Sequence, residues 1–396
     1  MRICIFARTM HRHRSYYSPP PVLLARVFAK LGHDVIALTT ELPDGSSGIF
    51  AEDSAEVHYL PSTPSGKVSK KFWAASAARF DQLHSDRPFD LILGRGKATW
   101  GYFRNSCFSG QVPVISHEGT YPKWLHILEK RARPLVPLLA GPLSVLLAFR
   151  NWEYRTCMQR SDRVICNSPA LAGALNRIYW WRRPKTGFIP YGFDVSAYVA
   201  ADPLTSSERA PRLVSVGRLT WDKGAIAMID ILAKVQRRDV ILEAIGPVNS
   251  KVRAAMVKRA KLHGVAERII IAGPEHNSKL PERLAGAVAF LFPSTHAEGF
   301  PKVVMEGMAA ALPLISYRLP GIETLIEDGV TGWLVPSRDT DRAAVKIDEL
   351  LGDPAAATAM GAAGRRRIEK VFPPERIAQS WETLIQTAVS EHKQGF

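Results

Sequence analysis

Cysteine is scarce in this sequence, and its spacing excludes two kinds of stabilised protein. The four cysteines among 396 residues are Cys4, Cys107, Cys157 and Cys166, and no two of them form a Cys-x-x-Cys pair. Disulfide-rich secreted domains and structural zinc sites need more cysteines or closer pairs. Two of the four also lie in apolar, strand-like runs. We therefore expect reduced, buried thiols and a cytoplasmic protein.

The sequence also lacks a long apolar run. The longest, residues 134–149, is PLVPLLAGPLSVLLAF, whereas a membrane-spanning helix needs about 20 apolar residues. The start, MRICIFARTM, lacks the segments of a signal peptide and predicts a first strand. Because Lys and Arg flank residues 134–149, that run predicts either a segment lying on a membrane surface or a buried helix between domains.

Acidic residues are too few to balance the basic ones. The chain has 52 Lys and Arg against 37 Asp and Glu, a net charge of +15. Residues 1–195 carry 26 basic and 14 acidic residues, a net of +12, so most of the excess lies in the first half. An anionic membrane surface, an acidic substrate, nucleic acid or simply a solvated basic surface would each account for it.

Short apolar runs alternate with helical patterns along both halves of the chain, which predicts parallel sheets covered on both faces. Helices are expected at 20–31, 68–86, 249–263, 302–311 and 375–390, and a polar linker at 192–211. The expected strands of the first half are 2–7, 34–39, 56–60, 89–93, 112–116, 163–167 and 186–189. Those of the second half are 212–217, 240–245, 268–272, 288–292, 313–316 and 332–335.

The predicted architecture is therefore α/β, with two Rossmann-like domains facing across a cleft. Residues 1–193 form the first domain and residues 194–372 the second. Residues 373–396 form a last helix that crosses back to the first domain. Ligands of such sheets bind beyond the carboxyl ends of the strands, so the cleft is the expected site.

The strongest chemical signal follows the strand that ends at Phe292. The loop carries Glu298 and Gly299, Pro301 stands where a helix begins, and the helix carries Glu306. The amino end of that helix can hold a phosphate. Five helical residues span about 7.5 Å, so the two carboxylates can reach a sugar and a ribose at opposite ends of one ligand.

A second signal is SVGRLTWDKG, residues 215–224. A strand is followed by Gly217, and the loop then carries Arg218 and Lys223 before a helix. Two cations at the carboxyl edge of a strand suit a diphosphate that leaves with negative charge.

Several segments together resemble the retaining GT-B glycosyltransferases of family 4, also called group 1. EGFPKVVME, residues 298–306, matches the family's Glu-x7-Glu motif, and VGRLTWDKG matches its Gly-Arg-Leu…Lys-Gly loop. Other family segments are similar to IPYGFD at 189–194, DRVICNSPAL at 162–171 and GVTGWLVP at 329–336. The resemblance covers residues 160–390 well and the first 130 residues loosely.

The resemblance implies a nucleotide-sugar donor in the second domain and an acceptor in the first. It implies that Glu298 contacts the donor sugar as a catalytic residue, and that Glu306 binds the ribose hydroxyls. It further implies that Arg218 and Lys223 bind the diphosphate. The rest of the implied donor site is Gly217, Gly299, Phe300 and Pro301.

The first half departs from the family pattern. Residues 8–21 contain no glycine where the family often has a Gly-Gly loop. His11, Arg12, His13 and Arg14 there either face an anionic acceptor or form a solvated basic loop. Departures in the second half are AAALP at 309–313 and LPG at 319–321.

Other candidates follow two neighbouring strands of the first half. His117 is either a contact of the donor sugar, as the resemblance implies, or a structural histidine under a loop. Arg95 and Lys97 are candidates for an acceptor phosphate. The Asp-x-Asp at 339–341 is interpreted as a helix cap rather than a metal site, and GAAG at 361–364 as a weak helix break.

We thus expect a retaining hexosyltransferase that needs no metal or cofactor and no nucleic acid. It would use a UDP- or GDP-sugar as donor and a lipid-linked or polysaccharide acceptor of the cell envelope, at the cytoplasmic face of an anionic membrane. Three alternatives stay open: a UDP-sugar epimerase of the same fold, a non-catalytic nucleotide-sugar-binding relative, and a nucleic-acid binder.

Overall fold

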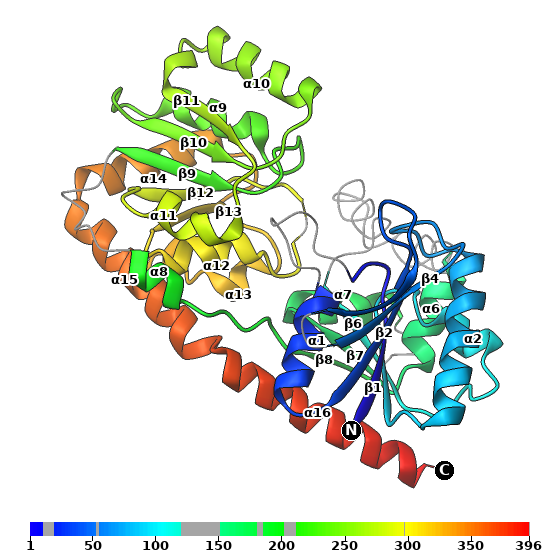
Figure 1. Ribbon diagram of the computed structural model, residues 1–396. Helices are drawn as coiled ribbons and strands as arrows, with labels where there is room; N and C mark the ends of the chain where they lie inside the picture. Colours follow the sequence, from blue (N-terminus) through cyan, green and yellow to red (C-terminus); the bar gives the residue numbers. More distant parts are fainter. Residues whose placement is uncertain are drawn as a thin grey trace. The chain divides into compact units, whose positions relative to one another are not determined.

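The computed structural model describes residues 1–10, 20–52, 55–119, 151–179, 185–201, 211–296 and 298–395. These residues divide into two compact units (Figure 1). Unit 1 comprises Met1–Pro190 and Glu375–Phe396, and unit 2 comprises Tyr191–Pro374. The apolar run 134–149 and the basic loop that holds His11, Arg12, His13 and Arg14 lie outside the described residues.

Unit 1 is built on a twisted sheet that is parallel except at one edge. In the described part of the chain its strand order is β3-β4-β2-β1-β5-β6-β7-β8, and β3 pairs antiparallel with β4. The strands are β1 Arg2–Phe6, β2 Asp34–Thr40, β3 Gly48–Glu52, β4 Ala55–Leu60, β5 Leu91–Gly94, β6 Val114–Glu118, β7 Arg163–Cys166 and β8 Thr186–Phe188.

Helices cover both faces of this sheet. Phe6 on β1 packs its ring against Phe80 of α2 on one face. On the other face, Trp381 of α16 packs against Phe28 of α1, with 5.7 Å between ring centroids. The described helices are α1 Pro20–Lys30, α2 Lys70–Asp86, α3 Trp100–Asn105, α6 Trp152–Arg160, α7 Pro169–Ile178 and α16 Pro374–Gln394.

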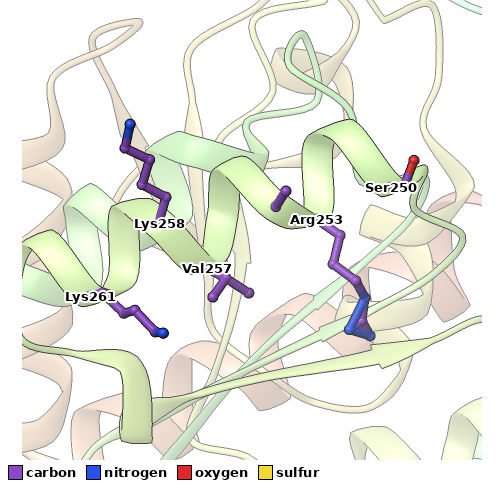
Figure 2. A pocket seen from close by; sticks show the side chains of 6 residues that line it. Ser250, Arg253, Val257, Lys258 and Lys261 are labelled. Carbon is purple, nitrogen blue, oxygen red and sulfur yellow. The ribbon is translucent and has the colours of Figure 1, made fainter.

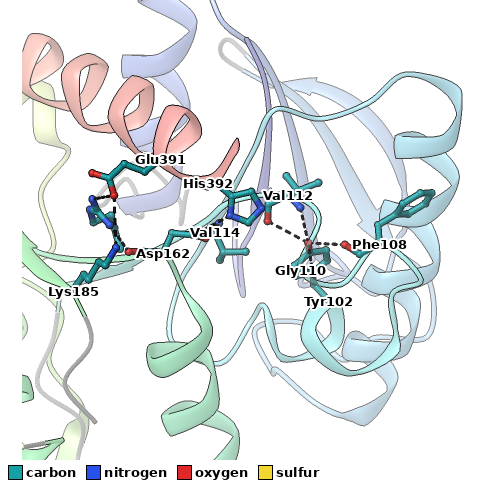
Figure 3. Close-up of polar contacts among 10 residues, drawn as sticks. Tyr102, Phe108, Gly110, Val112, Val114, Asp162, Lys185, Glu391 and His392 are labelled. Carbon is teal, nitrogen blue, oxygen red and sulfur yellow. Dashed lines mark hydrogen bonds and ion pairs between the residues drawn. The ribbon is translucent and has the colours of Figure 1, made fainter. Parts of the chain in front are cut away.

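Polar contacts hold the last turns of α16 on the sheet (Figure 3). His392 Nδ1 lies 2.8 Å from Asp162 Oδ1, and the other oxygen of Asp162 accepts the N–H of Val114 at 2.7 Å. Arg163 pairs with the Glu391 carboxylate, and Lys185 Nζ lies 3.7 Å from it. The chain's last helix is therefore an integral layer of unit 1.

Unit 2 has a wholly parallel sheet in the order β11-β10-β9-β12-β13-β14. Its strands are β9 Arg212–Val216, β10 Ile241–Ile245, β11 Ile269–Gly273, β12 Ala289–Phe292, β13 Leu314–Tyr317 and β14 Gly332–Val335. Its described helices are α8 Ser196–Ala201, α9 Ala225–Lys234, α10 Ser250–Leu262, α11 Leu280–Leu284, α12 Lys302–Ala309, α13 Ile322–Leu325, α14 Thr340–Gly352 and α15 Pro354–Val371.

Three expectations about these elements are wrong. The presumed linker contains α8, whose Tyr198 is buried against the unit 2 core. The GAAG segment does not break a helix but lies inside α15, where a Cβ on Gly361 would come within 2.0 Å of the Ala311 carbonyl oxygen. Cys107 is exposed, whereas Cys4, Cys157 and Cys166 are buried.

Candidate active site at the carboxyl edge of unit 2

Two loops meet at the carboxyl edge of the unit 2 sheet, one after β9 and one after β12. The carbonyl of Asp222 in the first loop accepts the N–H groups of Thr295, at 2.8 Å, and His296, at 3.0 Å, in the second. The Thr295 hydroxyl donates to the same carbonyl at 3.2 Å. The backbone carbonyl of Asp222 therefore holds together the two sequence motifs that are predicted to bind one ligand.

Two glycines allow this close approach. Gly224 has φ +83°, and a Cβ there would come within 2.2 Å of the Pro293 carbonyl oxygen. Gly321 has φ +87°, and a Cβ there would come within 2.2 Å of the Glu298 carbonyl oxygen and 2.4 Å of that of Gly299. Both positions combine a left-handed backbone with no room for a side chain, so only glycine fits.

The loops bring together a lysine and a glutamate predicted from the sequence. Lys223 Nζ forms an ion pair with Glu298 Oε1, and the Ser294 hydroxyl donates to the same oxygen at 3.4 Å. The side chains of Lys223 and Glu298 are 18% and 12% exposed. A charged pair that is largely removed from water but still reachable from the surface is a natural place for an anionic ligand.

Further charged groups surround this pair. Arg218 is exposed in the β9 loop. Burial lowers the pKa of His296, with Lys223 and Arg218 acting in the same direction against Glu298 and Asp222. Burial works to raise the pKa of Asp222, but the hydrogen bond from Thr220 and the nearby His296 and Lys223 outweigh it and hold that pKa below its usual value.

Glu306 lies on α12, about one turn beyond the loop, and its environment differs from that of Glu298. Its Oε2 is buried and has no hydrogen-bond partner among the described residues. Burial raises the pKa of Glu306, and the charge of Lys302 one turn earlier works against this. Burial in turn lowers the pKa of Lys302. A buried acceptor without a donor is costly in the free protein, so this oxygen is available for a ligand hydroxyl.

The remaining predicted donor residues shape the loop more than they line it. Phe300 is 4% exposed and packs its ring against Tyr191 and Phe372, at centroid distances of 6.1 and 5.3 Å. Pro301 immediately precedes α12, and Gly299 is buried. Gly217 follows β9 with φ +140° and donates its N–H to the Ile245 carbonyl at 3.0 Å.

In unit 1, His117 lies inside the packed structure. It is 1% exposed, and its ring lies 5.8 Å from that of Trp381 on α16. Burial and the charge of Arg95 lower the pKa of His117 to about 3. This burial agrees with a structural histidine, and a contact with a donor sugar stays a prediction.

Arg95 and Lys97 lie in the turn after β5, beside a buried acid that the sequence analysis did not assign. Both cations are half-buried. Glu118 at the end of β6 is 4% exposed, and its Oε1 accepts the N–H of Gly96 at 2.8 Å. Burial raises the pKa of Glu118 to about 7, opposed by the charge of Arg95 and by this hydrogen bond.

Sequence reasoning missed several groups that build the unit 2 site. Asp222 lies in the segment 215–224, but it joins the two loops through its backbone carbonyl. A pattern of residue types does not reveal a backbone contact of this kind. Lys302 lies inside the Glu-x7-Glu segment, four residues before Glu306. This helical spacing could have indicated that the two side chains lie close together. Gly321 belongs to LPG, which was interpreted as a departure from the family pattern.

The Asp-x-Asp segment caps a helix, as expected. Asp339 is the residue before α14, and its side chain accepts the N–H of Arg342 at 2.9 Å. Asp341 pairs with Lys234. Among the described residues there is no cluster of three or more metal-ligating side chains. That the reaction needs no metal stays a prediction.

Sequence comparison assigns the family. Residues 22–197 match the family described as Glycosyltransferase Family 4, and residues 201–367 match Glycosyl transferases group 1. The chain belongs to the group 1 GT-B glycosyltransferases.

The curated relatives align over only part of their length. The lipopolysaccharide core biosynthesis glycosyltransferase LpsE of Rhizobium meliloti is 26% identical over 64% of this chain and 73% of its own. The D-inositol 3-phosphate glycosyltransferase of Frankia alni is 28% identical over 52% of this chain and 54% of its own. The chain thus spans about half of the Frankia relative and about three quarters of the Rhizobium one.

Solved structures align with nearly the whole length of this chain. Sucrose-phosphate synthase from Thermosynechococcus elongatus superposes with a TM-score of 0.77 at 18% identity, over 98% of this chain and 99% of its own. Anabaena Alr3699/HepE in complex with UDP and glucose superposes with a TM-score of 0.71 at 17% identity, over 98% and 100%. At these identities the likeness establishes the GT-B fold alone. In the described part of this chain, no helix is both long and apolar enough to cross a membrane.

Proposed function

We propose that this chain is a retaining glycosyltransferase that moves a hexose from a UDP- or GDP-sugar to a lipid-linked or polysaccharide acceptor of the cell envelope. The observation that carries the proposal is the largely buried Lys223–Glu298 pair, held between two loops that only glycines allow to meet. The names of relatives involved in lipopolysaccharide core synthesis support the acceptor class. The Anabaena structure, which contains UDP and glucose, supports the donor class.

The charges of the site suit each part of such a donor. Lys223 and Arg218 would neutralise the diphosphate, which gains negative charge as the glycosidic bond breaks. Lys223 is already paired with Glu298 in the free protein. A bound diphosphate would compete for the ammonium group and release the carboxylate to accept hydrogen bonds from sugar hydroxyls. Glu306, with its unpartnered Oε2, would accept from the ribose hydroxyls.

The proposed reaction needs no nucleophile from the protein. The bond from the anomeric carbon to the phosphate oxygen breaks, and a bond to the acceptor oxygen forms on the same face. The acceptor's proton passes to the leaving phosphate. Glu298 would position the sugar and stabilise the charge that develops on it. We further propose that the acceptor is reached at an anionic membrane surface, since the first half of the chain carries a net charge of +12.

A direct assay separates this function from its alternatives. Purified protein is incubated with UDP- and GDP-sugars, with and without membrane glycolipid extract, and products are followed by mass spectrometry and by the anomeric NMR signal. Acceptor-dependent release of nucleotide with retained configuration supports the proposal. Isomerised nucleotide sugar without acceptor would indicate an epimerase, and binding without turnover on any acceptor a non-catalytic relative. An inverted product would contradict the retaining mechanism.

A further inference from the structure

One helix of unit 2 carries a basic surface that the donor site does not use. Helix α10, Ser250–Leu262, contains five Lys and Arg and no Asp or Glu. Of these cations, Arg259 pairs with Asp230, and Arg253 donates to the carbonyl of Ile271 at 2.9 Å. The other three have no carboxylate partner among the described residues: Lys251, Lys258 and Lys261. A surface of one sign that is not neutralised internally attracts an anionic partner.

Apolar side chains lie among these cations. Val252, Met256 and Ala260 form the buried side of α10. On its outer side, Val257 is 40% and Leu262 72% exposed. Arg253, Val257, Lys258 and Lys261, together with Ser250 and Ala254, line a shallow groove along the helix (Figure 2). The exposed surface therefore alternates cations with apolar groups rather than separating them.

The neighbouring strand extends this surface. β11 is the edge strand of the unit 2 sheet, and its Ile270 is 45% exposed. β11 contains no charged side chain, and the next acid along the chain after α10 is Glu267. Arg253 covers part of the open edge by its hydrogen bond to the Ile271 carbonyl. The helix and the edge strand together offer basic and apolar groups with few acids.

The composition distinguishes between anionic partners. Sites for single-stranded nucleic acid interleave cations with aromatic rings on which bases stack, and α10 and β11 contain no aromatic residue. Exposed aliphatic groups between lysines suit a lipid surface, where the aliphatic groups enter the interface and the long lysine stems reach the headgroups. From Lys251 to Lys261 the helix extends about 15 Å, so it can meet several headgroups at once.

Resting on the membrane-borne acceptor of the proposed function, we propose that α10, with the adjoining β11 edge, gives unit 2 a docking surface of its own for an anionic lipid membrane, in addition to the basic first half. This surface lies outside the donor site but is joined to it, because Leu219 of the β9 loop donates its N–H to Pro247, just before α10, at 2.9 Å. Docking through α10 therefore orients the carboxyl edge of unit 2 relative to the membrane.

The test is co-sedimentation of the full chain with vesicles of phosphatidylcholine alone and of phosphatidylcholine with phosphatidylglycerol. The test variant is Lys258→Gln/Lys261→Gln. A matched control, Arg342→Gln/Arg366→Gln, removes two exposed cations from α14 and α15 of the same unit. Binding of UDP, read as a thermal shift, checks that each variant keeps the unit 2 fold.

We expect the wild-type chain to partition onto phosphatidylglycerol vesicles only. The α10 variant should lose roughly 10- to 30-fold in partition coefficient, as two lysines near an anionic surface imply, and the control less than threefold. Val257→Glu should also weaken binding. Equal partitioning of the α10 variant and the wild type, binding that ignores phosphatidylglycerol, or tighter binding to a single-stranded oligonucleotide than to vesicles would each overturn the proposal.

Discussion

The two units have similar parallel sheets, yet the carboxylates at their carboxyl edges are held in different ways. In unit 2, Glu298 lies in a loop, pairs with Lys223 and can be reached from the surface. In unit 1, Glu118 ends a strand, is 4% exposed and accepts a backbone N–H. The carboxylate of Glu298 can therefore be reached by a ligand, whereas the hydrogen bond to Glu118 stabilises the turn after β5. On the proposed function, Glu298 is placed to act on a ligand, whereas the contacts of Glu118 are those of a packed structural group.

The largest expected effect comes from removing the unit 2 carboxylate. Glu298→Ala should lower the rate of sugar transfer by about 10²–10³-fold, as for the loss of one stabilising group in a transition state. Nucleotide binding should be nearly unchanged, because Lys223 and Glu306 remain. Steady-state transfer assays and calorimetric titration with UDP measure the two quantities. Full activity of this variant would remove Glu298 from its proposed role.

The second effect tests how the loop is held. Gly321→Ala places a Cβ against the carbonyls of Glu298 and Gly299, so the loop must shift. A displacement of about 1 Å can cost up to 10²-fold in rate, and we expect roughly 10- to 100-fold here. Gly352→Ala is the matched control, since a Cβ there has nothing within 4 Å. If both variants transfer sugar equally well, the position of the loop does not limit the reaction.

The third effect should appear in stability. The folded pKa of Glu118, about 7, lies above the ordinary value of 4.5, so the folded state holds this proton more tightly than the unfolded state. The stability it contributes is full below pH 4.5 and is lost as the pH rises through 7. Glu118→Gln should therefore stabilise the protein at pH 8 by roughly 1–3 kcal/mol and leave it unchanged at pH 4. Denaturant titrations at both pH values measure this, and a loss of stability at pH 8 would contradict the assignment.

The smallest effect concerns Glu306, whose pKa is also raised by burial. The folded state therefore holds this proton more tightly than the unfolded state, and the free energy of unfolding falls as the pH rises above the ordinary pKa of a glutamate. Glu306→Gln should remove this effect and so flatten the dependence of the melting temperature on pH above 5. Saturating nucleotide should reduce the difference between the two proteins, because ribose hydroxyls would then satisfy the carboxylate. A pH dependence that the substitution leaves unaltered would show that Glu306 is ordinarily solvated.

Much of the fold could be predicted because short apolar runs alternate with helical patterns. The exceptions have local causes. β3 was missed because its apolar run, residues 49–51, is only three residues long and directly follows the glycine- and serine-rich residues 45–48. α8 was missed because the helix has only six residues and follows a polar stretch, although its Tyr198 is buried. Gly361 looked like a helix break because glycine has low helix propensity, but close packing on Ala311 decides its place.

Only those parts of the candidate site that side chains form could be predicted from the sequence. Residue types and spacing identified Lys223, Glu298 and Glu306. The carbonyl of Asp222 that joins the loops, and the close contact at Gly321, depend on backbone positions that come from distant parts of the chain. His117 was ambiguous for the same reason, since only the packing of Trp381 shows that its ring is covered.

On the proposed function, the carboxyl edge of unit 2 binds a nucleotide sugar through Lys223, Arg218 and Glu306. The most direct measurement is a thermal-shift panel with UDP, GDP, ADP and their common sugar conjugates on the wild type and on Glu306→Ala. We expect a clear rise in melting temperature with UDP or GDP and its sugar conjugate, and loss of most of that rise in the variant. No shift with any nucleotide, or an equal shift in both proteins, would contradict this proposal.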